Sequence, residues 1–101
     1  MNNAESPEVL NNANARRFEL FSGESMARLD YRLQARTIVL VHTEVPPEIA
    51  GRGVGAKLAK AALEYARESG LTVVPLCSYV ADYIRRNPQY QALTEPSGGT
   101  R

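Results

Sequence analysis

The spacing of hydrophobic residues divides the first half of the chain into three strands. Alternation around Phe18 and Leu20, and again over residues 26–33, predicts two strands joined by a hairpin turn at residues 22–25. Residues 37–45 are rich in β-branched side chains, and their apolar first half indicates a central strand. Two prolines, Pro46 and Pro47, end this third strand.

The second half of the chain alternates between helices and a strand. Leu58, Ala62 and Ala66 recur at helical spacing, and Gly70 is typical of a helix C-terminus. Residues 71–76 predict a fourth strand, and Ser78 is placed to cap a second helix that ends near Arg86, before an Asn-Pro pair. The order β-β-β-α-β-α predicts an α+β fold in which a mixed, mostly antiparallel sheet is backed by helices.

Both ends of the chain have the composition of unfolded segments. The sequence from residue 1 to about residue 15 is polar and Asn-rich, and residues 95–101 are rich in Gly, Pro and Ser. We predict disorder at residues 1–8 and 95–101 and one domain over residues 9–94. A chain of 101 residues has room for one modest core.

Charge and cysteine content exclude several classes of protein. The twelve basic and eleven acidic residues are interspersed and give a net charge of +1, so we expect no nucleic-acid partner. The single cysteine cannot form an intrachain disulfide, which favours a reducing compartment. The sequence shows no signal peptide and no apolar run of about 20 residues, so we expect a cytoplasmic protein without membrane contact.

Three glycines, Gly51, Gly53 and Gly55, alternate between the third predicted strand and the first predicted helix. Backbone N–H groups are unpaired at this positive end of a helix, and glycine lets a phosphate approach the backbone closely. The pattern therefore predicts an anion site. The alternative is a glycine-rich turn that only connects strand and helix.

Two nucleotide-binding motifs do not fit this loop. A Walker A motif would need Gly, then Lys, then Ser or Thr, where Ala56, Lys57 and Leu58 stand. The dinucleotide pattern is formally met by Gly51, Gly53 and Ala56, but three strands precede it and no acidic residue follows the next strand. What remains is a pyrophosphate at a helix N-terminus, beside a strand whose end is opened by prolines. Coenzyme A offers both a pyrophosphate and an amide-rich arm.

Taken together, the motifs of residues 9–93 resemble the GNAT N-acetyltransferase superfamily, and closely its small single-domain subgroup. The segments that carry the resemblance are Arg17-Phe18-Glu19-Leu20, Ala27-Arg28-Leu29-Asp30-Tyr31, His42-Thr43-Glu44-Val45-Pro46, Gly51-Arg52-Gly53-Val54-Gly55, Val74-Pro75-Leu76-Cys77-Ser78-Tyr79-Val80 and Arg86-Asn87-Pro88-Gln89-Tyr90. The resemblance implies a truncated GNAT-like fold. It also implies an N-acetyltransferase that moves an acetyl group from acetyl-coenzyme A to a primary amine.

The resemblance assigns the cofactor-binding residues. The backbone of Val45 would hydrogen-bond the pantetheine arm, and backbone amides of the loop would hold the pyrophosphate. The loop residues are Gly51, Arg52, Gly53, Val54, Gly55 and Ala56. Ala50 stands where the family usually has Arg or Gln. The short subgroup also lacks the helices that shape the acceptor pocket elsewhere, so a non-catalytic coenzyme A-binding module and a structural interaction domain are the alternative functions.

Three residues are candidates for catalysis. Cys77 lies between a strand and a helix N-terminus, a position that favours the thiolate form of its side chain. It is therefore a candidate nucleophile or a group that positions the thioester. The alternative is a small buried core residue. His42 and Glu44 are two apart on one strand and project to the same face, where either could take the amine proton. Their alternatives are a structural histidine and an exposed carboxylate.

The remaining polar groups give weaker signals. Many GNAT enzymes use a tyrosine of the last helix as a general acid, but Tyr79, Tyr83 and Tyr90 do not match the usual position, and Tyr83 is better explained by core packing. With one histidine and one cysteine, a protein-only zinc site is excluded, and we expect no metal.

Overall fold

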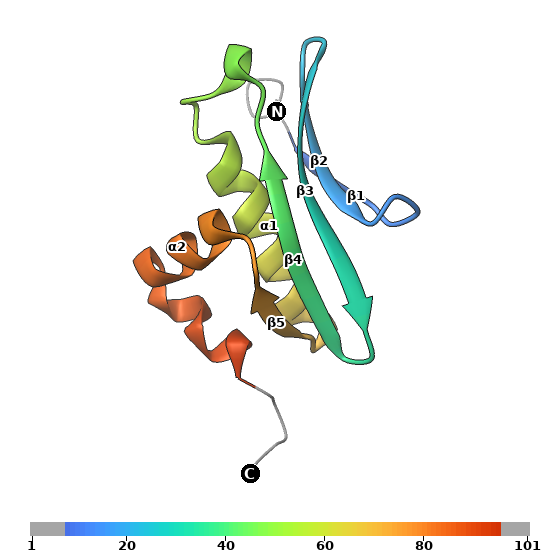
Figure 1. Cartoon of the computed structure of the whole chain (residues 1–101), viewed down its shortest axis with the longest axis vertical. Coiled ribbons are helices and arrows are strands. Elements are labelled where there is room, and N and C mark those ends of the chain that lie inside the picture. The colour runs from blue at the N-terminus through green and yellow to red at the C-terminus, as the bar shows by residue number, and fades with distance from the viewer. Residues whose placement is uncertain (1–7, 96–101) are drawn as a thin grey trace, which may run out of the picture.

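The computed structural model describes residues 8–95, which form a five-stranded sheet with two helices (Figure 1). In chain order the elements are β1 Val9–Asn12, β2 Arg17–Ser22, β3 Ser25–Gln34, β4 Thr37–Glu44, the short 3₁₀ helix η2 Pro47–Ile49, α1 Val54–Ser69, β5 Thr72–Pro75, α2 Ser78–Arg86 and the 3₁₀ helix η3 Pro88–Thr94. None of the helices in this part of the chain is long and apolar enough to cross a membrane.

The sheet is mixed, as its sequence predicts. Its strands lie in the order β1-β2-β3-β4-β5, with antiparallel pairs everywhere except between β4 and β5, which are parallel. The α1 helix makes the crossover from β4 to β5 and lies behind the sheet in Figure 1. It packs on β2, β3, β4 and β5, while α2 packs beside it on β4 and β5.

The first strand, which is absent from the predicted order, corrects the expectation that residues 9–15 have no regular structure. Val9–Asn12 pairs with β2 in a regular antiparallel register and extends the sheet by one strand. A short turn at residues 13–16 joins the two strands directly, with Arg16 at a φ of 57°. The predicted disorder at residues 1–8 and 95–101 concerns positions that, apart from Glu8 and Glu95, lie outside the described residues, and it stays a prediction.

Most other element predictions are confirmed. The β2–β3 hairpin turns at residues 23–24, with Gly23 at a φ of 61°. The α1 helix ends at Gly70, whose φ of 69° is the left-handed conformation that glycine adopts without strain. Ser78, however, is not the cap of α2, because Cys77 occupies the N-cap position and makes no side-chain capping bond. The η2 and η3 helices are additions to the predicted order.

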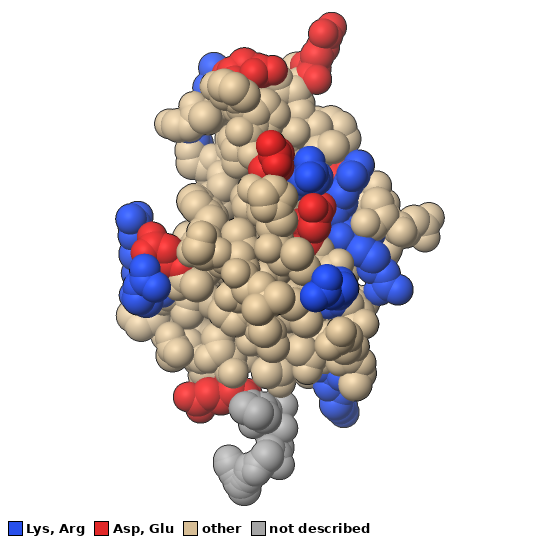
Figure 2. Space-filling view, in the orientation of Figure 1, with Lys and Arg blue, Asp and Glu red and all other residues tan. Residues whose placement is uncertain are grey.

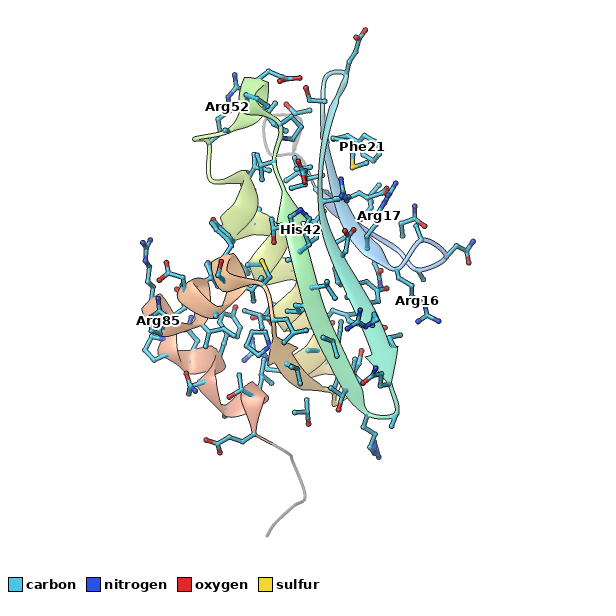
Figure 3. The ribbon with its side chains drawn as sticks, viewed as in Figure 1. Arg16, Arg17, Phe21, His42, Arg52 and Arg85 are labelled. Atoms are coloured by element: carbon cyan, nitrogen blue, oxygen red, sulfur yellow. The ribbon has the colours of Figure 1, made fainter. Side chains whose placement is uncertain are left out.

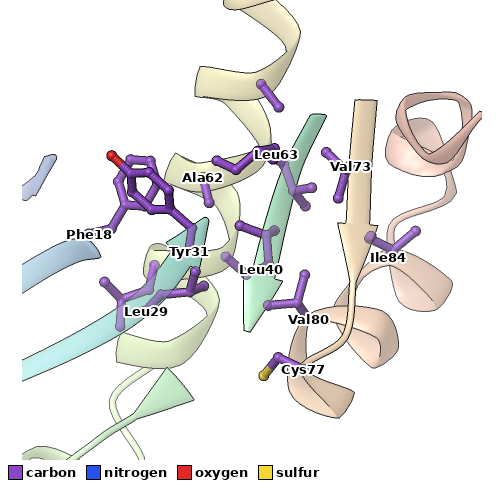
Figure 4. Close-up of a cluster of buried hydrophobic side chains, with 14 of the residues drawn as sticks. Phe18, Leu29, Tyr31, Leu40, Ala62, Leu63, Val73, Cys77, Val80 and Ile84 are labelled. Atoms are coloured by element: carbon purple, nitrogen blue, oxygen red, sulfur yellow. The ribbon is translucent and has the colours of Figure 1, made fainter. Parts of the chain in front are cut away.

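The core lies between the sheet and α1 (Figure 4). Its fully buried larger side chains are Leu20, Leu29, Ile38, Leu40, Leu58, Leu63, Val73 and Val80. Small residues of α1, such as Ala59 and Ala62, let the helix approach the sheet closely. The opposite face of the sheet, which we call the outer face, carries alternate residues of the same strands and is largely polar.

A β-bulge in β4 changes which side chains reach the outer face. Tyr31 pairs with Leu40 and Asp30 pairs with His42, so Val41 has no partner on β3. Up to Leu40, even-numbered residues of β4 face α1. After the bulge this parity is reversed: Thr43 pairs with buried Leu29 on the core face, and His42 is on the outer face.

Candidate active site

The edge of β4 that faces α2 is free along its last residues. The β4–β5 ladder ends where Leu40 pairs with Pro75, and the Cys77 amide donates one further bond of 2.9 Å to the Leu40 carbonyl. The chain then turns into α2, while β4 continues to Glu44. Backbone groups from Val41 onward therefore have no strand partner on this side in the described part of the chain, and they are available to a ligand rich in amides.

The N-terminus of α1 lies next to this free edge. Gly53 is its N-cap and has a φ of 73°, while Gly51 has a φ of 83°. The first intrahelical bond is donated by Lys57 to the Gly53 carbonyl at 3.0 Å, so the three amides before it have no helical partner. The first turn of α1 also carries no acidic side chain. This geometry suits an anion, because the helix dipole adds to the free N–H groups.

A cavity of about 250 Å³ connects the loop to the end of β4. Its lining residues are Val45, Ala50, Gly51, Gly53, Val54, Gly55 and Tyr79. Side-chain carbons added at Gly51 or Gly53 would meet nothing within 4 Å, so the backbone there is open to an incoming phosphate. Arg52 is exposed beside the cavity, at the outer end of the loop in Figure 3. The glycine cradle and the cavity together fit a pyrophosphate followed by an extended chain.

Tyr79, which does not match the usual position of the family's general acid, is still part of the candidate site because it lines this cavity. Its ring lies against Gly55, where a Cβ atom would come within 2.7 Å of the ring carbon Cζ and of the hydroxyl oxygen. The tyrosine is 45% exposed and comes from the first turn of α2. Gly55 is therefore needed for the close packing of an aromatic ring as well as for the loop. A helix–helix contact of this kind has no local signal in the sequence.

His42 and Glu44 lie together on the outer face, as their spacing predicts (Figure 3). The distance between His42 Nε2 and Glu44 Oε1 is 2.8 Å, and both side chains are more than half exposed. The hydrogen bond from His42 and the charges of His42 and Arg28 lower the pKa of Glu44. An ionised carboxylate only accepts hydrogen bonds, so Nε2 carries the proton that is donated and Nδ1 is left as the free basic atom of the imidazole.

Cys77 lies on the other side of β4. It is 9% exposed, and its Sγ is 3.3 Å from the hydroxyl of Thr43, which faces the core side of the strand. Because His42 projects from the outer face, the structure does not bring the thiol and the imidazole together. Cys77 and the glycine loop flank the free edge of β4, whereas the His42–Glu44 pair lies on the outer face of the same strand segment.

The other tyrosines of the C-terminal segment have structural partners. Tyr83 is half-buried, and burial raises its pKa. Tyr90 is buried and donates a 2.7 Å hydrogen bond to Glu64 Oε2, which raises its pKa to about 12. Residues 8–95 contain no group of three or more His, Cys, Asp or Glu side chains that could hold a metal ion.

Residues 17–93 match the sequence model of a family described as GCN5-related N-acetyl-transferase. The human and mouse proteins named NATD1 are each 43% identical to the chain over 58 residues, and the Xenopus tropicalis protein of this name is 41% identical. Each alignment covers 57% of this chain, and 51% of the human and 53% of the mouse and Xenopus proteins. The chain thus spans about half the length of these curated relatives.

A solved structure of a GCN5-like protein from Staphylococcus aureus has the same fold. Its TM-score is 0.68 with 29% sequence identity, and the superposition covers 93% of this chain and 96% of that one. The resemblance to GNAT proteins that the motifs indicated is confirmed by the family model and by the solved structure. Since the family model covers well over half of its residues, the chain belongs to the GCN5-related N-acetyl-transferase family.

Proposed function

We propose that this protein is an acetyl-coenzyme A-dependent N-acetyltransferase whose acceptor is a primary amine. The observation that carries the proposal is the cavity between the glycine loop and Val45, because it joins an anion site to a free strand edge. The amides of the loop, including those of Arg52 and Ala56, would hold the pyrophosphate. The backbone at Val45 would bind the pantetheine arm and stabilise negative charge on the acetyl oxygen. Bound acetyl-coenzyme A would supply an activated acetyl group as a thioester.

His42 is the proposed general base. Its free Nδ1 would take a proton from the acceptor ammonium, while Glu44 holds the ring through Nε2 and stabilises the imidazolium that forms. Glu44 is a poorer base than His42 here, because its lowered pKa favours the ionised form that already accepts this bond. The amine would approach from the outer face, and the thioester would lie along the free edge of β4.

Direct attack by the amine is the favoured route. Cys77 is buried against Thr43 and is separated from His42 by the strand itself, so this histidine cannot remove its proton. We therefore assign Cys77 a positioning role beside the thioester. In the alternative route the Cys77 thiol would accept the acetyl group and release coenzyme A before the amine attacks.

Calorimetric titration tests the cofactor site. Acetyl-coenzyme A should bind, and acetyl-pantetheine, which lacks the pyrophosphate, should bind at least about tenfold more weakly because the loop amides lose their ligand. Gly53→Glu places a carboxylate at the proposed anion site and should weaken the binding of acetyl-coenzyme A by a similar factor. Gly23→Glu is the matched control, since Gly23 has a similar positive φ in the β2–β3 turn and adds the same charge. Absence of binding at millimolar acetyl-coenzyme A would refute the proposal.

A non-catalytic coenzyme A-binding module is the second candidate. It is favoured by the direct turn between β1 and β2, because no helix is inserted there to shape an acceptor pocket in the described part of the chain. Release of free coenzyme A thiol in the presence of primary amines distinguishes the two functions. The amines to be tested are peptide N-termini, lysine side chains and polyamines. If acetyl-coenzyme A binds but none of these amines causes release of the thiol, the result would support the non-catalytic module.

A further inference from the structure

Exposed apolar side chains gather where β5 ends and α2 begins. The described part of the chain has six large hydrophobic residues that are exposed, and three of them, Val74, Leu76 and Tyr79, lie within six consecutive residues. Leu76 is the most exposed of the six, at 61%. A single exposed leucine needs no explanation, but a cluster of exposed apolar side chains marks a contact surface. The cofactor site and the catalytic pair proposed above use neither Val74 nor Leu76.

The sheet register places these two residues beside the free edge of β4. Val74 is opposite Val39, which lies on the outer face and is only 5% exposed. The ladder between β4 and β5 ends one residue before Leu76, so Leu76 lies where the free edge begins. His42 comes from the same end of β4 and is on the outer face. We call Val39, Val74 and Leu76 the apolar strip.

The apolar strip lies in an uncharged part of the molecule. Residues 69–81 contain no Asp, Glu, Lys or Arg, in a chain in which these types make up 23% of the residues. Figure 2 shows the surface over β5 in tan, between the charges over β2 and β3 and those over α2. A ligand with a charged body would lose water here without gaining a partner. A hydrocarbon chain would gain free energy in proportion to the area that it covers.

We propose that the apolar strip binds the carbon chain of the acceptor, which is then an amine whose ammonium group ends an uncharged hydrocarbon chain. This inference rests on the proposed function, in which His42 deprotonates the amine and the thioester lies along the free edge of β4. Glu44 and Asp30 are the acidic neighbours of His42 on the outer face, and they favour a cationic group at this end. The chain would run toward β5, across Leu76. Free alkylamines and the lysine side chain share this chemistry.

Straight-chain amines from ethylamine to hexylamine test the strip, because they differ in length and hardly in basicity. At saturating acetyl-coenzyme A, kcat/KM should rise about twofold per added methylene, as expected when about half of each methylene is covered. Hexylamine should therefore exceed ethylamine about 15-fold, and Leu76→Ser should reduce this gain to less than about fourfold. Leu10→Ser is the matched control: Leu10 is 53% exposed on β1, far from the strip in strand order, and this variant should keep the full gain.

Two further amines define the chain that the strip accepts. The diamine of the same length as hexylamine should lose most of the gain, because its second ammonium group would lie on the strip. Nα-acetyl-lysine methylamide carries the same length of carbon chain as butylamine. Activity equal to that of butylamine would identify a lysine side chain as the source of the acceptor, and much lower activity would identify a free alkylamine.

The outcomes separate this inference from the proposed function. Equal activity toward all the amines, or a gain that survives in Leu76→Ser, would overturn the inference and leave the proposed function intact. If no amine causes thiol release, the proposed function fails, and amide chemical shifts still test the strip: hexylamine should shift the amides of Val74, Leu76 and Cys77. Absence of these shifts would overturn the inference too. So would a native dimer that dissociates in Leu76→Ser, because the strip would then be a contact between two copies.

Discussion

At the scale of single residues, the His42–Glu44 pair makes the sharpest prediction. His42→Gln removes the proposed base, and kcat for amine acetylation should fall about 100-fold, within the range for general-base catalysis. Binding of acetyl-coenzyme A, measured by calorimetry, should be unchanged because the imidazole is on the outer face, away from the loop. Arg32→Gln, an exposed change on β3, is the control. A histidine variant with native kcat would exclude His42 as the base.

Cys77 makes a prediction that separates positioning from nucleophilic attack. Direct attack by the amine implies that Cys77→Ala loses less than about tenfold in kcat, because only a contact near the thioester is removed. Intact-mass measurement after mixing the native protein with acetyl-coenzyme A should then show no acetylated enzyme. A stoichiometric mass increase that disappears in the alanine variant would instead establish the covalent route.

At the scale of elements, a side-chain hydrogen bond connects β1 to a buried residue of β3. The Asn11 side chain of β1 accepts a 2.7 Å hydrogen bond from the buried Tyr31 hydroxyl on β3. Asn11→Ala leaves that hydroxyl without its acceptor and should lower the free energy of unfolding by about 1–2 kcal/mol. The measurement is urea denaturation of four proteins: native, Asn11→Ala, Tyr31→Phe and the double variant. If the bond is the cause, the asparagine change should cost clearly less when residue 31 is phenylalanine.

The same elements show why the sequence predicted some features and not others. The alternation in β2 and β3 and the helical spacing in α1 are repeated signals that report burial of one face. These signals were sufficient to predict the three elements from the sequence. The four residues of β1 include two asparagines and the exposed Leu10, so no alternation was visible. The glycine loop was predicted because its signal is local. The bulge at Val41, which moves His42 to the outer face, depends on pairing with β3 and has no local signal.

At the scale of the whole molecule, η3 is attached to α1 through one ionisable contact. The Tyr90 hydroxyl of η3 donates a hydrogen bond to Glu64 of α1, and Arg67 lies over the Tyr90 ring with its guanidinium carbon 5.9 Å from the ring centre. The hydrogen bond to Glu64, followed by burial, raises the pKa of Tyr90 from 10.0 to about 12. The folded state therefore holds this proton more tightly than the unfolded chain does. The contact also links the C-terminal segment to the helix that begins at the glycine loop.

This linkage sets the direction of the alkaline response. The stabilisation is complete below the unfolded-state pKa of 10.0 and is lost as the pH rises toward the folded-state value of about 12. Between pH 9 and pH 11 the Tyr90 contribution should fall by about 1 kcal/mol. Tyr90→Phe lacks the titrating group, so its unfolding free energy, measured by urea denaturation, should be lower at pH 8 but decline less steeply over this interval. Identical slopes in the two proteins would show that the contact does not control alkaline stability.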